Sequence, residues 1–194
     1  MSAEAHKHGV DPLTGQYTRT AIGIHWIMAI LIVSAFGLGL IMTDIPGFSM
    51  TKLKYYSWHK WLGVTIFLFA VIRVLWRATH PAPALEPHIS RVENILAHAV
   101  HILLYLLIFI VPLSGYFYSL AAGFPIVYLG IIPIPSFIGP HPEIADTLKE
   151  VHGVLVYTMA GIVGLHVAGA LKHYVIDRDG TLARMLPFLK RSDS

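Results

Sequence analysis

Apolar side chains occur in four long runs along the chain, separated by segments richer in polar residues, glycine and proline. Each run is close to the roughly 20 residues that an α-helix needs to cross the hydrocarbon core of a bilayer. The sequence therefore predicts an all-α integral membrane four-helix bundle. The expected spans cover residues 20–43, 57–77, 92–120 and 147–176, with Pro112 kinking the third helix and Asp146 capping the fourth.

The segments between the runs are predicted to be loops. Residues 44–56 and 79–90 are polar or rich in proline, and residues 123–145 are apolar but broken by proline, so we expect this last loop to lie against the membrane surface. Residues 1–19 form a polar tail without the layout of a signal peptide. We expect one transmembrane domain over 20–178 and a C-terminal tail over 179–194.

Composition and charge agree with a membrane protein. Hydrophobic residues make up 55% of the 194 residues and charged residues only 13%, which is unusual for a soluble domain. Ten of the 14 lysines and arginines fall on the side of the two termini, which predicts that both termini are cytoplasmic. Since the positive charges follow topology in this way, we do not interpret the net charge of +3 as nucleic-acid binding.

Every predicted span contains at least one histidine. The chain has 12 histidines and no cysteine, which excludes thiolate metal sites and covalent attachment of haem through cysteine. At about 1.5 Å per residue, His25 and His166 fall near the inner edge of the bilayer, whereas His59 and His152 fall near the outer edge. His152 and His166 are 14 residues apart and share one helix face.

Each level thus combines one histidine of the fourth span with one from another span. This is the arrangement needed for two stacked haems, each held between two imidazoles, because buried neutral imidazole is a good iron ligand. A structural hydrogen-bonding role is the alternative for any single histidine. Small residues near these positions would let a porphyrin approach the helices, although glycine is also common where membrane helices meet; they are Gly23, Gly63, Gly153, Gly164 and Gly169.

Other polar residues near the inner edge have two interpretations each. Arg73 and Arg77 lie one turn apart, and their forked side chains suit haem propionates as well as simple positive-inside anchoring. His98 and His101 share a face of the third span and compete for the ligand role. We favour supporting contacts for both, because neither has an unassigned partner at its depth.

Several motifs give the chain a resemblance to the prokaryotic cytochrome b561 family, over about residues 17–187. They include IHW at Ile24–Trp26, WHKWLG around His59, RVLWRATHPAP, LAHAVHILLYLL, the LKEVHG and GLH segments of the fourth span, and HYVIDRDGTLARMLP. The resemblance implies a four-helix bundle with two b-type haems in a bacterial inner membrane. It also implies the ligand pairs His25 with His166 and His59 with His152.

Within this family the chain resembles the superoxide oxidase type. That resemblance implies electron transfer from superoxide at the outer face to ubiquinone near the inner face, with no obligate protein partner. It places His173 at the quinone, where it could hydrogen-bond a carbonyl and donate a proton; interfacial anchoring is the alternative. Lys172 and Tyr174 are weaker candidates. Positive charge could guide superoxide or contact lipid headgroups at four outer residues, Lys52, Lys54, Lys60 and Lys149.

Two other functions are compatible with parts of this pattern. A membrane-anchor cytochrome b subunit would pass electrons between a partner dehydrogenase or hydrogenase and quinone, but the short tails and loops favour a protein that acts alone. A non-redox zinc or proton transporter would be expected to carry acidic residues within its spans. Here Glu93 and Glu150 lie only at span ends. The histidines in tails and loops are expected to be solvated, namely His6, His8, His80, His88 and His141.

Overall fold

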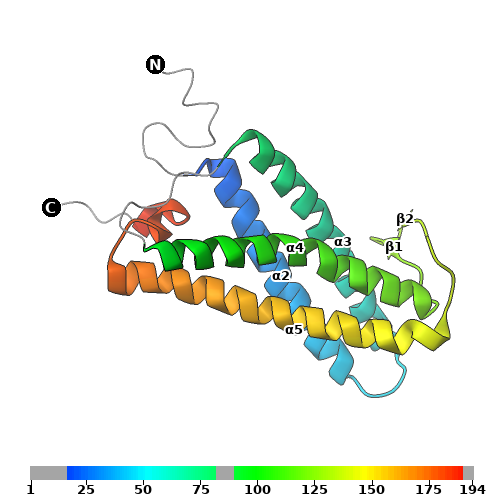
Figure 1. Ribbon diagram of the computed structural model, residues 1–194. Coiled ribbons are helices and arrows are strands. Elements are labelled where there is room, and N and C mark those ends of the chain that lie inside the picture. Colours follow the sequence, from blue (N-terminus) through cyan, green and yellow to red (C-terminus); the bar gives the residue numbers. More distant parts are fainter. Residues whose placement is uncertain (1–16, 82–89, 190–194) are drawn as a thin grey trace. The chain divides into compact units, whose positions relative to one another are not determined.

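The computed structural model describes residues 17–81 and 90–189. In these ranges it confirms the predicted all-α class (Figure 1). Four helices are long and apolar enough to cross a membrane: α2 (Arg19–Asp44), α3 (Met50–Thr79), α4 (Arg91–Ala121) and α5 (Pro142–Lys172). The π-helical turn η2 (His173–Asp177) continues α5.

Side-chain caps explain where the helices begin. The hydroxyl of Ser49 accepts from the backbone of Lys52, so α3 begins at Met50 and not at residue 57 as expected. Ser90 and Glu93 form a reciprocal capping box at the start of α4, in which each side chain accepts from the other residue's backbone nitrogen. Pro112 lies inside a continuous α4.

The start of α5 corrects a second expectation. The helix begins at Pro142, because proline fits the first helical turn, where its missing N–H leaves no hydrogen bond unmade. Asp146 therefore lies inside α5 and cannot be its cap.

The loop before α5 contains a small hairpin that the apolar pattern did not predict. Strand β1 (Val127–Tyr128) pairs antiparallel with β2 (Ile132–Pro133). The turn uses left-handed backbone at Leu129 (φ 52°) and Gly130 (φ 76°). Several hydrogen bonds hold the loop to the helices. For example, Trp61 Nε1 donates to the Val127 carbonyl at 2.7 Å, and the Tyr116 hydroxyl donates to the Pro135 carbonyl at 2.6 Å.

Residues after η2 fold back in short helical turns. They form η3 (Leu182–Arg184) and η4 (Pro187–Leu189). The indole of Trp26 donates to the carbonyl of Met185 at 3.0 Å, which ties this segment to α2.

The chain divides into two compact units. The first comprises the described parts of residues 1–26, 71–104 and 161–194, and the second comprises residues 27–70 and 105–160. Many large apolar side chains are exposed on the helices, as at Ile30, Leu75 and Ile102. An apolar surface of this extent would promote aggregation in water but suits the hydrocarbon core of a bilayer.

Candidate functional site

The second unit contains a pair of facing histidines, His59 on α3 and His152 on α5. Their ring centroids are 6.2 Å apart. The Nδ1 of His59 lies 3.0 Å from the carbonyl oxygen of Ala35, and the Nδ1 of His152 lies 2.9 Å from the hydroxyl of Ser114. We call this pair the His59 site.

These hydrogen bonds decide which ring nitrogens can bind a metal. A carbonyl oxygen only accepts, so the Nδ1 of His59 must carry the proton. The Ser114 hydroxyl donates to the Val111 carbonyl at 2.8 Å and therefore accepts from the Nδ1 of His152. In the neutral imidazole each Nε2 then keeps its lone pair. Such fixing of the tautomer by a neighbouring acceptor is characteristic of histidines that bind metals.

Two glycines let the helices approach these rings. A Cβ atom on Gly39 would lie 3.3 Å from Cε1 of His59. A Cβ atom on Gly115 would lie 2.9 Å from Cε1 of His152, which is too close for an unshifted side chain. Any larger residue at either position would displace a histidine of the pair.

The first unit contains a second pair, His25 on α2 and His166 on α5, which we call the His25 site. The two ring centroids are 6.1 Å apart. His101 of α4 also approaches His166, with centroids 5.2 Å apart. The Nδ1 of His101 lies 2.7 Å from the Ala97 carbonyl of its own helix, and the Nδ1 of His98 lies 2.8 Å from the Asn94 carbonyl.

The ring separations test whether each pair could hold a haem iron. With metal–imidazole bonds of about 2.0 Å on both sides of one ion, in line, the ring centroids would be about 6.3 Å apart. The observed 6.1 and 6.2 Å fit this value, whereas the 5.2 Å between His101 and His166 is too short. The residues thus fit two bis-imidazole sites, and the pairing of ligands stays a prediction.

The glycines expected near the haems leave room in the structure. A Cβ atom at any of them would meet no protein atom within 4 Å outside its own stretch of helix, so none is a close contact between helices. This open space is compatible with a flat cofactor and holds for all five, Gly23, Gly63, Gly153, Gly164 and Gly169.

Positive charge lies beside the His25 site. Arg73 of α3 is close enough to act electrostatically on His25, His101 and His166, and Arg77 acts on His101. Both arginines are thus in the first unit with the histidine pair, as their proposed role toward propionates requires. His98 is exposed on α4.

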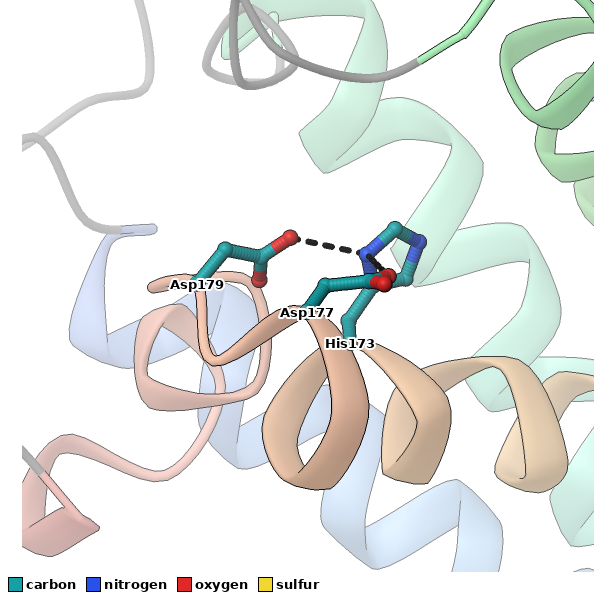
Figure 2. Close-up of side chains that lie close together, drawn as sticks. All are labelled: His173, Asp177 and Asp179. Carbon is teal, nitrogen blue, oxygen red and sulfur yellow. Dashed lines mark hydrogen bonds and ion pairs between the residues drawn. The ribbon is translucent and has the colours of Figure 1, made fainter.

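His173 has a different environment from the paired histidines. Its Nδ1 contacts two carboxylates, Asp179 Oδ2 at 2.8 Å and Asp177 Oδ2 at 3.1 Å (Figure 2). Burial raises the pKa of the Asp179 carboxyl, but hydrogen bonds from Thr181 and His173 outweigh this, and its pKa lies below the ordinary value. In the described chain, the ring contacts of the His25 site involve Trp26, His25, His101 and His166 and do not include His173.

Lys172 is part of the same charged end of α5. Its Nζ lies 2.6 Å from Glu93 of α4 and 2.7 Å from Asp177. Lys172 therefore joins the ends of α4 and α5 through ion pairs. We had expected it only to contact lipid headgroups. Tyr174 follows within the π-helical turn.

The four lysines expected to face superoxide differ in surroundings. Lys60 is partly buried, with its Nζ 3.4 Å from the Ser119 hydroxyl and 3.5 Å from the Phe124 carbonyl. Lys52 donates to the Ile45 carbonyl at 2.8 Å, and Lys54 and Lys149 are exposed.

Two of the histidines expected to be solvated make specific contacts. His80 stacks on Trp76 with ring centroids 4.0 Å apart, and His141 pairs with Glu143 at 2.9 Å. His6, His8 and His88 lie outside the described residues.

Several site residues were missed by reasoning from the sequence. Contacts between helices bring three residues to the histidines of the His59 site, namely Gly39, Gly115 and Ser114. No local sequence motif identifies them. Asp177 and Asp179 could have been found, because the segment HYVIDRDG sets two carboxylates close after His173.

Comparison with known proteins finds a matching family model and similar proteins. The family model described as prokaryotic cytochrome b561 matches residues 16–188. Cytochrome b561 homolog 2 of Escherichia coli (strain K12) is 35% identical over 171 residues, which cover 88% of this chain and 91% of that protein. The probable superoxide oxidase CybB of Yersinia pestis is 30% identical over 176 residues, 89% of this chain and 96% of that protein.

Proposed function

The chain belongs to the prokaryotic cytochrome b561 family, and from this premise we propose that it oxidises superoxide and reduces ubiquinone in a bacterial inner membrane. As a member of this family it is a multi-pass membrane cytochrome that binds b-type haem and takes part in electron transfer. The relative named a probable superoxide oxidase supports superoxide as the donor. The proposed orientation, with both termini cytoplasmic, follows from the distribution of lysine and arginine.

The observation that carries the proposal is the pair of matched imidazole separations. His25 with His166 and His59 with His152 would each hold one haem, because both pairs have the spacing that two axial ligands on one iron require. When bound, each haem would supply a one-electron redox centre, and two imidazole ligands would favour electron transfer over oxygen binding.

The protein's own side chains hold and tune these positions. Ala35 and Ser114 orient the rings of the His59 site through Nδ1, which would leave Nε2 of each ring available to bind the iron. Arg73 and Arg77 would neutralise propionates at the His25 site, since a guanidinium fork matches a carboxylate. His98 and His101 would add supporting contacts there.

Charge and protons balance across the proposed reaction. Two superoxide anions each lose one electron and become dioxygen, and one ubiquinone takes up both electrons and two protons to give ubiquinol. The four outer lysines, Lys52, Lys54, Lys60 and Lys149, would raise the encounter rate of the anionic substrate. His173 would hydrogen-bond a quinone carbonyl and transfer a proton to it.

Stopped-flow absorption on the purified protein would test this function. A pulse of superoxide should reduce the haems rapidly, and added ubiquinone should reoxidise them. If superoxide reduces the haems slowly while dithionite reduces them readily, the donor is another molecule. The account as a membrane-anchor subunit would then replace this one, and a co-purifying dehydrogenase or hydrogenase would support it.

A further inference from the structure

We propose that His173, Asp177 and Asp179 bind a divalent transition-metal cation, with Zn²⁺ as the best match to the donor set. The three residues lie at the end of α5 and immediately after it (Figure 2). The site uses none of the four paired histidines, so the inference does not depend on superoxide or quinone being the substrates.

The donor atoms are already gathered. One imidazole nitrogen and two carboxylate oxygens lie within 4.8 Å of one another, in a part of the chain where every residue is described. Ligand atoms at about 2.0–2.2 Å from a tetrahedral Zn²⁺ are about 3.3 Å apart. The present separations from Nδ1 are 2.8 and 3.1 Å, so each carboxylate oxygen needs to move away from Nδ1 by only about 0.5 Å or less.

The backbone explains how two aspartates reach one imidazole. In a continuous α-helix, Asp179 would sit six residues after His173 and about 240° around the axis, away from it. The π-helical turn and left-handed Arg178 (φ 55°) end the helix instead. The His173 carbonyl then accepts from the backbone nitrogen of Arg178 and, at 3.1 Å, from that of Asp179, which brings the second carboxylate back to the ring.

The mixed donor set selects the metal. Imidazole favours Zn²⁺ and its neighbours in the transition series over Mg²⁺ and Ca²⁺, and Zn²⁺ also accepts aspartate oxygen. Three protein ligands would leave a fourth position for water or another ligand. Lys172 forms an ion pair with Asp177, which the cation would also bind. If Asp177 turned toward the cation, Lys172 would keep its 2.6 Å ion pair with Glu93.

The second ring nitrogen of His173 stays available. Both carboxylates contact Nδ1, and Figure 2 shows the other nitrogen pointing away from them. A cation on Nδ1 would therefore fix the ring and leave Nε2 free for a hydrogen bond to another molecule.

Equilibrium dialysis of the full-length, haem-loaded, untagged protein against Zn²⁺, followed by elemental analysis, would test the site. After treatment with a chelator, the wild type should take up about one tightly bound Zn²⁺ per chain. Loss of a residue that only orients a ligand typically lowers metal affinity about 10–100-fold. The double variant Asp177→Asn with Asp179→Asn should therefore bind at least about tenfold more weakly.

Glu143→Gln is the matched control, because Glu143 pairs with His141 at 2.9 Å but offers only a two-donor site. It should bind Zn²⁺ as the wild type does. Where the double variant loses its haem spectrum, His173→Gln removes the nitrogen donor and retains both carboxylates. The proposal is overturned if the wild type binds no tight Zn²⁺, if the aspartate variants keep wild-type affinity, or if Glu143→Gln weakens binding equally.

Discussion

Substitution of Gly115 by alanine should disturb the His59 site specifically. The added methyl carbon would lie 2.9 Å from Cε1, 3.3 Å from Nδ1 and 3.4 Å from Nε2 of His152. Carbon atoms in good contact are about 3.5–4.0 Å apart, so the ring must shift by about 0.6 Å or more. The Ser114 hydrogen bond at 2.9 Å opposes that shift.

The size of the effect follows from the cost of overpacking. An extra methyl group in a packed site typically costs about 1–3 kcal/mol. If this cost acts on the position of the axial ligand, haem affinity at the His59 site should fall about 5–150-fold. Haem content and a potentiometric titration would measure the loss, which should affect one of the two proposed haems and leave the other unchanged.

Two further glycines provide a graded comparison. Gly39→Ala places its methyl carbon 3.3 Å from Cε1 of His59 and should have a smaller effect. Gly37→Ala, on the same helix, meets nothing within 4 Å and should leave both haems intact, with a gain in helix stability of up to about 1 kcal/mol. If Gly115→Ala matches Gly37→Ala in haem content and midpoint potentials, our account of the packing around His152 is wrong.

Three other substitutions test separate parts of the account. Ser114→Ala removes the acceptor for Nδ1 of His152 and should shift the midpoint potential of one haem only; equal shifts of both would argue against a local effect. His173→Ala should keep both haems but slow quinone reduction, and an unchanged rate would remove His173 from the quinone site. Lys60→Met should slow haem reduction by superoxide, and the effect should be largest at low salt. If the variant and the wild type react at the same rate at every salt concentration, steering by Lys60 is excluded.

The helices could be predicted from the sequence because each apolar run is long enough to cross a bilayer. Their ends could not be predicted as well. The start of α3 depends on the Ser49 cap, and the start of α5 on Pro142 in the first turn, so both helices extend beyond their apolar runs. The hairpin in the loop before α5 depends on hydrogen bonds from Trp61 and Tyr116, which are distant in sequence.

The histidine pairs were predicted from depth alone, and the structure brings the members of each pair to within 6.1–6.2 Å between ring centroids. Their supports could not be predicted in this way. Ser114 and Gly115 lie on α4, and only the approach of α4 to α5 shows that they contact His152. The aspartates beside His173 depend on the π-helical turn, which helical periodicity does not predict.

In the proposed function, two imidazole pairs each hold one haem. Low-temperature electron paramagnetic resonance, combined with haem quantification, would test it on the wild type, His166→Ala and His152→Ala. We expect about two low-spin haems per chain in the wild type. Each variant should lose a different one of the two signals. Two haems retained in His166→Ala, or the same signal lost from both variants, would contradict the assignment.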